Sequence, residues 1–144
     1  MKQEVFSIYT DGGIVKSQIS EKGDIVSVDI GRVTFNSREV PVQGSDREVL
    51  NEIITVNEQE FTFCAASIGN PHCVILCDQI SAKHAQRFGP KIEVDNRFPN
   101  RTNVQFLKVL DNSNIQIEIW ERGAGYTLAS GSSSAAAAVA YRLG

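Results

Sequence analysis

The sequence predicts an α+β domain in which a strongly curved, mostly antiparallel sheet wraps around a central buried helix. Three observations support this fold. Short stretches with alternating apolar residues recur along most of the chain, and residues typical of turns separate them. Only two stretches have helical character. One of them, residues 135–140, is small and apolar on every side, which is typical of a helix buried in a core.

The chain begins with a predicted meander of strands. Residues 4–10 and 14–20 are rich in β-forming side chains and are joined by Asp11-Gly12-Gly13, a typical hairpin turn. After a turn at residues 21–24, apolar residues alternate with polar ones up to Gly31. Residues 34–46 contain Pro41 and Gly44, so we expect an edge strand or a loop there.

A second hairpin is predicted from residues 49–56 and 61–68, with a turn at Glu58 and Gln59. Its second strand leads to the turn Gly69-Asn70-Pro71-His72 and to a further apolar strand over residues 73–76. Asn70 is therefore expected on a turn between buried strands.

The first helix is predicted to begin after Ser81, a good N-cap residue. We expect it to end near Phe88, because Gly89 is suited to stop a helix and Pro90 to prevent its continuation. Its expected role is to cover one face of the sheet.

The last third is predicted to form a hairpin of residues 104–110 and 115–120, followed by a helix that opens at Ser130, Gly131 and Ser132. The first turn of any helix presents backbone N–H groups that lack intrahelical partners and the positive end of the helix dipole. This turn is thus a candidate site for a carboxylate or phosphate.

Size and charge limit the possible functions. The chain has 144 residues, which suits one domain over residues 1–144, and its formal charge is -3 from 14 basic and 17 acidic side chains. The mild, mixed charge argues against nucleic acid or an anionic membrane as a partner, and a soluble cytoplasmic protein is expected. The three cysteines, Cys64, Cys73 and Cys77, match no zinc spacing and are interpreted as reduced thiols in the core.

Polar groups are predicted at the ends of several strands: Asn70 with His72, Asn103, and Glu121 with Arg122. Together with the helix N-terminus, an arginine and two carboxamides suit a zwitterionic ligand such as an amino acid, since arginine and backbone N–H groups bind carboxylates and amide oxygens bind an ammonium group. The alternative is that the arginine is a solvated surface charge and that the asparagine before proline serves only the turn.

Three motifs resemble those of the diaminopimelate epimerase family, in the same order. Residues 121–132 followed by an alanine-rich helix resemble its pattern Glu-Arg-Gly-x-Gly-Glu-Thr-x-Ala-Cys-Gly-Thr/Ser-Gly. Residues 69–74 resemble its Gly-Asn-Pro-His motif, and residues 103–106 its Asn-Val-x-Phe segment. The meander over residues 6–35 also resembles the strands that begin the second half of the family's proteins. The resemblance implies that the chain corresponds to most of the C-terminal half of a two-domain epimerase.

What the resemblance implies is inversion of an amino-acid α-carbon without a cofactor, by two cysteines that face each other across the substrate. Asn70, Asn103 and Arg122 would bind substrate, and Glu121 would contact or orient its ammonium group. The backbone of Gly131 and Ser132 would hold the α-carboxylate. His72 would support the pocket.

The sequence departs from the family pattern at two of these positions. Ser130 stands where the family has a catalytic cysteine, and Tyr126 stands where it has glutamate. A serine hydroxyl is far less acidic than a thiol, and the family's other catalytic cysteine has no counterpart here. Ser130 could be an engineered change, a natural branch or a sign of lost activity. We favour a natural branch because both positions depart together, with Tyr126 as a hypothetical proton carrier.

The function predicted by the resemblance is conversion of LL- to meso-diaminopimelate, a precursor of lysine and the cell wall, with this isolated half inactive. No metal, pyridoxal phosphate or other cofactor is implied. The expected partners are the amino-acid substrate and either a missing N-terminal half or a second copy. Two other functions stay open: a binding module without turnover, and an isomerase of the phenazine-biosynthesis type on the same fold, for which Glu121 would supply the carboxylate.

Overall fold

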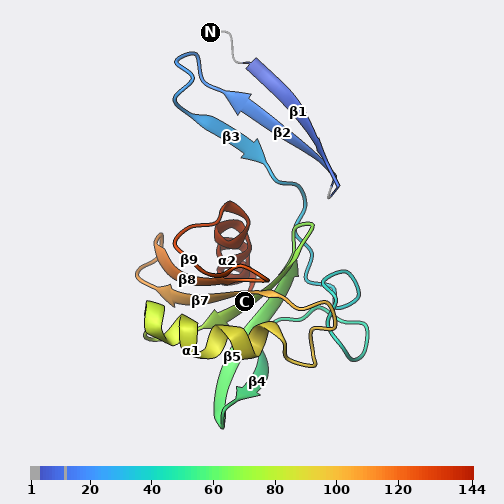
Figure 1. Ribbon diagram of the computed structural model, residues 1–144, viewed down its shortest axis with the longest axis vertical. Helices are drawn as coiled ribbons and strands as arrows, with labels where there is room; N and C mark the ends of the chain where they lie inside the picture. The colour runs from blue at the N-terminus through green and yellow to red at the C-terminus, as the bar shows by residue number, and fades with distance from the viewer. Residues whose placement is uncertain (1–3, 12) are drawn as a thin grey trace. The chain divides into compact units, whose positions relative to one another are not determined.

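The computed structural model describes residues 4–11 and 13–144. Where the sequence predicts one domain over residues 1–144, the structure groups the chain into two compact units, Met1–Arg32 and Val33–Gly144. Gly12, in the first predicted turn, lies outside the described residues. The elements described in the first unit are strands, whereas the second unit contains both helices and the larger sheet (Figure 1).

The first unit is an antiparallel sheet of three strands: β1 (Glu4–Thr10), β2 (Gly13–Ile19) and β3 (Val26–Asp29). Phe6 pairs with Ser17, which pairs with Val28, so these three side chains share one face of the sheet. Phe6 and Val28 are 45% and 50% exposed. The predicted meander is therefore confirmed, and its sheet leaves large apolar side chains in contact with solvent.

The second unit is built on a sheet of six strands in sequence order. The strands are β4 (Glu52–Val56), β5 (Gln59–Ser67), β6 (Pro71–Leu76), β7 (Asn103–Val109), β8 (Ile115–Glu121) and β9 (Gly125–Thr127). Every neighbouring pair is antiparallel except β6 and β7, which are parallel and therefore need a crossover. Helix α1 (Ala82–Glu93) supplies that crossover.

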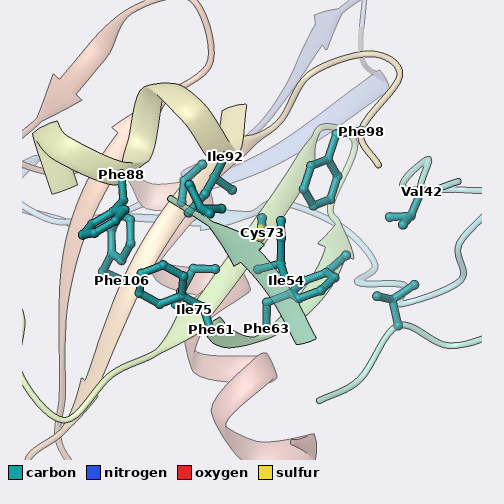
Figure 2. Close-up of a cluster of buried hydrophobic side chains, with 14 of the residues drawn as sticks. Val42, Ile54, Phe61, Phe63, Cys73, Ile75, Phe88, Ile92, Phe98 and Phe106 are labelled. Atoms are coloured by element: carbon teal, nitrogen blue, oxygen red, sulfur yellow. The ribbon is translucent and has the colours of Figure 1, made fainter. Parts of the chain in front are cut away.

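Each face of this sheet supports a separate apolar cluster. Phe63, Ile75 and Phe106 pack with Phe88 and Ile92 of α1 on one face (Figure 2). The next residues along the same strands point to the other face, where they pack with the alanines of helix α2 (Gly131–Leu143). Because side chains alternate along a strand, this arrangement places the two helices on opposite faces of the sheet. We refer to these as the α1 face and the α2 face.

The prediction that α1 ends near Phe88 is wrong, because the helix continues through Gly89 and Pro90 to Glu93. Its start is as predicted, since the Ser81 side chain accepts a hydrogen bond from the His84 N–H at 3.1 Å. Pro90 cannot donate to the carbonyl four residues earlier, but that carbonyl belongs to an exposed residue and can bind water. Burial of the Ile92 side chain stabilises the extra turn of the helix.

Gly89 serves packing rather than helix termination. A Cβ atom at this position would lie 2.5 Å from Cγ of Trp120 and 2.6 Å from its Cβ, closer than atoms in proteins approach. The absence of a side chain therefore lets β8 approach α1, and the indole ring of Trp120 covers the helix at this point.

Helix α2 begins at the predicted place, with Ser130 as its N-cap. Its buried side chains are Ser133, Ala136, Ala137 and Ala140, and they pack across the central strands of the sheet. Ser134 and Ala138, on the opposite side of the helix, are exposed. Among the described residues, neither helix is long and apolar enough to cross a membrane.

Candidate functional site

Asn70, just before β6, and His72, within β6, are joined by a hydrogen bond. The His72 Nε2 atom is 2.9 Å from Oδ1 of Asn70, an oxygen that only accepts hydrogen bonds. His72 therefore carries its proton on Nε2 and donates it to Asn70. Because the amide oxygen of Asn70 is engaged in this way, the amide group presents its NH2 donors to a ligand.

Gln105 connects His72 to helix α2. Its Nε2 atom lies 3.0 Å from Nδ1 of His72, which accepts a hydrogen bond in this tautomer, and it donates to Oγ of Ser133 at 2.9 Å. Gln105 and His72 are fully buried and Ser133 is 1% exposed. A continuous chain of hydrogen bonds thus runs through the core from Asn70 to the first turn of α2.

His72 is uncharged at neutral pH. Burial away from water lowers its pKa to about 4, and the positive charge of Arg122 lowers the pKa further. A neutral imidazole is what the tautomer above requires. His72 therefore orients Asn70 and does not act as a charged ligand.

Asn103 fixes the position of Arg122. It pairs with His72 across the parallel strands β6 and β7 and is 7% exposed. Its Nδ2 donates to the Pro71 carbonyl at 2.9 Å, and its Oδ1 accepts the backbone N–H of Arg122 at 2.8 Å. The guanidinium of Arg122 is exposed and donates to the carbonyl of Asn100 at 3.1 Å. Asn103 thus joins the turn that carries Arg122 to Pro71, the residue after Asn70.

The turn after β8 carries Glu121 and Arg122. It closes with a hydrogen bond from the Ala124 N–H to the Glu121 carbonyl at 3.2 Å, and Gly123 and Gly125 have φ angles of +75° and +87°. Glycine adopts such angles at no steric cost, because it has no Cβ atom. Glu121 is half-buried and lies on the α2 face, two residues beyond Ile119. Its carboxylate is a suitable partner for an ammonium group.

The N-terminus of α2 completes the site. Ser130 Oγ accepts the Ser133 N–H at 3.3 Å and lies 3.3 Å from Ser132 Oγ, and the first hydrogen bond of the helix runs from the Ser134 N–H to the Ser130 carbonyl. The N–H groups of Gly131 and Ser132 precede that bond and are available to an anion. The hydroxyl of Ser130 serves as a helix cap at the position where the resemblance places a catalytic thiol.

The three cysteines are free and none of them is activated. Cys73 packs in the cluster on the α1 face, and burial raises its pKa. Cys64 accepts the Asn51 N–H at 3.4 Å, and burial raises its pKa too. Burial raises the pKa of Cys77 to about 11. All three are thiols rather than thiolates at neutral pH, so they lack the basicity that proton abstraction requires.

Tyr126 is not part of this group. It pairs with Trp120 and packs with it against the cluster on the α1 face, and its hydroxyl donates to Glu118 at 2.6 Å. His72, Asn103 and Glu121 lie on the α2 face. The six-stranded sheet therefore separates the hydroxyl of Tyr126 from the candidate site, which removes the geometric basis for Tyr126 as a proton carrier.

Sequence reasoning missed Gln105, the buried link between His72 and Ser133. The signal for Gln105 is an amide inside the otherwise apolar run of residues 104–107. A buried polar side chain needs a partner, which points to a network. Among residues 4–11 and 13–144 there is no group of three His, Cys, Asp or Glu side chains that could hold a metal ion.

Comparison with known proteins identifies the family of this chain. The family profile described as diaminopimelate epimerase matches residues 64–144, more than half of the chain and the part that carries all the groups above. The chain belongs to the diaminopimelate epimerase family. Membership in this family, which was expected from the three motifs, is thereby confirmed.

Individual relatives of the diaminopimelate epimerase family extend the match to nearly the whole chain. Diaminopimelate epimerase 2 of Nostoc sp. strain PCC 7120 is 64% identical over 143 residues, which are 99% of this chain and 50% of that protein. Diaminopimelate epimerase of Carboxydothermus hydrogenoformans is 39% identical over 136 residues, 94% of this chain and 49% of that protein. The chain thus spans about half the length of the curated relatives it matches.

The fold is also found in a solved structure, that of a hydroxyproline epimerase from Agrobacterium vitis with bound trans-4-hydroxy-L-proline. The TM-score is 0.65 at 16% sequence identity, and the match covers 98% of this chain and 44% of that one. The predicted α+β fold of the diaminopimelate epimerase type is confirmed by this likeness. The named relatives are isomerases.

Proposed function

We propose that this chain is most of the C-terminal half of a cofactor-independent epimerase that converts LL- to meso-diaminopimelate. The observation that supports this most strongly is the hydrogen-bond network that joins Asn70 to the first turn of α2 and joins Asn103 to the backbone of Arg122. These groups recognise carboxylates, and Glu121 next to them suits an ammonium group. A cytoplasmic location stays a prediction.

The ligand binds in an orientation set by these donors. The α-carboxylate lies on the N–H groups of Gly131 and Ser132, where the helix dipole favours negative charge. The NH2 group of Asn70 and the guanidinium of Arg122 are further donors, so they suit carboxylate oxygens rather than the ammonium group. This differs from the first expectation for Asn70, because its amide oxygen already accepts the hydrogen bond from His72.

The described residues supply binding groups, but none of them is placed as a strong base beside Ser130. Removal of an α-proton requires a base of suitable pKa within hydrogen-bond distance, and an alcohol such as Ser130 meets this condition only with a strong base beside it. The hydroxyls and the helix turn around Ser130 provide no such base. We therefore propose that the isolated chain binds the substrate without turning it over.

A second half of the protein, or a second copy of this chain, is the proposed partner. The three-stranded sheet of the first unit exposes Phe6, Ile8, Val26 and Val28, each 45% to 54% exposed, on the same face. A sheet of three strands is stable only when an apolar face is covered by another part of the protein or by a partner. Solvent exposure of both faces of this sheet is therefore unfavourable. The relatives, which are about twice as long, have additional chain to supply the cover.

Calorimetric titration of the chain with LL-diaminopimelate tests the binding proposal. The matched control ligand is cadaverine, which has the same two amines at the same separation along the chain but no carboxylates. We expect diaminopimelate to bind at least about tenfold more tightly, because the donors of the site recognise carboxylates. The variant Arg122→Gln should reduce this preference. Equal affinity for the two ligands would contradict the proposed site.

Incorporation of solvent deuterium at the α-carbon of diaminopimelate distinguishes the enzyme from a second candidate, a binding module without turnover. The observation in favour of the module is that Ser130 acts as a helix cap and no cysteine lies among the binding groups. Proton NMR of diaminopimelate in D2O measures the exchange. Exchange by this chain only when the other half of a relative is added supports the epimerase, whereas none in either mixture supports the module.

A further inference from the structure

Glu93, the last residue of α1, is a buried carboxylate with three donors around it. It is 5% exposed. Its Oε2 accepts the indole N–H of Trp120 at 2.8 Å, and its Oε1 accepts the backbone N–H of Gly123 at 2.9 Å and forms an ion pair with Arg101. The donors come from β8, from the turn after it and from the loop before β7, so one side chain ties three segments together.

The two N–H groups that begin this turn are held by two side chains from different elements. The Arg122 N–H donates to Asn103 of β7, and the next N–H, that of Gly123, donates to Glu93 of α1. Consecutive N–H groups in an exposed turn ordinarily bind water and leave the turn free to change shape. Here both are fixed, and the direction in which Glu121 and Arg122 leave the turn is fixed with them.

Glu93 is held in its charged form. Burial by itself raises the pKa of this carboxyl group, but hydrogen bonds from Trp120 and Gly123 and the charge of Arg101 outweigh that effect and keep the pKa below its ordinary value. A carboxylate offers two acceptor oxygens, and both are used. A glutamine of the same size offers one oxygen and would turn an NH2 group toward one of the remaining donors.

We propose that Glu93 is a positioning residue for the Glu121–Arg122 turn, holding the ligand-binding groups of that turn in place from the α1 face of the sheet. The inference rests on the proposed function only in assigning ligand binding to Glu121 and Arg122. The ligand does not touch Glu93, which acts through the Gly123 N–H and the Trp120 ring.

Amide hydrogen exchange measured by NMR on the full 15N-labelled chain tests this role without any ligand. Gly123 is exposed, yet its amide should exchange at least about tenfold more slowly than that of the exposed turn residue Asn112. In Glu93→Gln, we expect Gly123 exchange to accelerate about tenfold and the emission of Trp120, the single tryptophan, to shift. Unprotected Gly123 in the unaltered chain would overturn the proposal even if the variant failed to fold.

The control variant is Arg101→Gln, which removes the charge of the half-exposed partner and leaves both oxygens of Glu93 to Trp120 and Gly123. Its Gly123 exchange should stay within about threefold of the parent. An effect as large as that of Glu93→Gln would mean that the ion pair, not the acceptor geometry, holds the turn. Amides of β5 and β6 report whether each variant keeps its fold.

Titration with diaminopimelate tests whether the position of the Glu121–Arg122 turn affects ligand affinity. If the parent chain binds, Glu93→Gln should weaken binding about tenfold and Arg101→Gln should not, because a displaced turn moves Arg122 away from its ligand. Equal affinity of Glu93→Gln and the parent would overturn the positioning role. If the parent does not bind while Glu93→Gln still frees Gly123, the proposed function fails and the structural role of Glu93 stands.

Discussion

Asn103 accepts the backbone N–H of Arg122 at 2.8 Å while it donates to the carbonyl of Pro71 at 2.9 Å. One nearly buried amide thus joins the start of β6 to the turn after β8, which are 51 positions apart in the chain by their numbers, 71 and 122. Both ends of the amide are used, so its orientation is determined. The site depends on this link more than on any contact between neighbours in sequence.

Asn103→Ala should destabilise the chain by about 2 kcal/mol, because it removes two hydrogen bonds and leaves the Arg122 N–H without its partner. Urea unfolding followed by circular dichroism measures the change. Asn112→Ala, in the exposed turn between β7 and β8, is the matched control and should shift stability by less than about 0.5 kcal/mol. Equal effects of the two variants would show that the Asn103 link contributes nothing.

His72 should make the chain less stable in acid. Its pKa in the folded state is about 4, below the ordinary 6.5, so the unfolded state binds more protons between these values. Stability is then full above about pH 6.5 and falls as the pH drops toward 4. At 1.36 kcal/mol per pKa unit, the loss from pH 7 to pH 5 is about 2 kcal/mol.

Urea unfolding of the parent and of His72→Gln at pH 7 and pH 5 measures this contribution. The pH dependence of the variant should be smaller by about 2 kcal/mol, since glutamine does not titrate. His84, whose pKa burial also lowers, is present in both proteins and cancels in the comparison. An unchanged pH dependence would mean that His72 is protonated in the folded chain.

Ser130→Cys should create a reactive thiol. The residue caps α2, and a thiolate at a helix N-terminus is stabilised by the dipole and the free N–H groups, so its pKa should lie below the ordinary value of about 8.5. The rate of alkylation by iodoacetamide as a function of pH measures that pKa. Cys77, with a pKa of about 11, is the internal control. A thiol at residue 130 that reacts only at the pH where Cys77 reacts would contradict an anion-binding helix turn.

Gly89→Ala should destabilise the chain by about 1 to 3 kcal/mol, because the added methyl group lies 2.5 Å from Trp120 Cγ and forces the ring away. Thermal unfolding measures the loss, and Trp120 emission reports the movement of the ring. Gly131→Ala is the control in the other helix, where an added Cβ meets nothing within 4 Å. If Gly89→Ala gained stability from its better helix propensity, the close approach of α1 and β8 would be refuted.

Local patterns in the sequence predicted the elements whose formation depends on near neighbours. Ser81 and Ser130 cap their helices through the N–H three residues later, and the turn at residues 111–114 joins β7 to β8 as expected. The motif residues Asn70, Asn103 and Arg122 could also be identified, since each belongs to a short recognisable pattern. For the two helix caps and the turn, the interaction that decides the structure spans only a few residues.

Only the tertiary structure determined where α1 ends and where the side chains of Tyr126 and Gln105 lie. The sequence alone marks Gly89 and Pro90 as the end of a helix, but burial of Ile92 and the approach of Trp120 outweigh that local preference. Likewise, side chains alternate along β8 and β9, which places Tyr126 on the α1 face, away from the site. Gln105 forms a hydrogen bond with Ser133, which lies on a helix distant in the sequence. These outcomes depend on which elements pack together, because a packed neighbour contributes more free energy than the propensity of one residue.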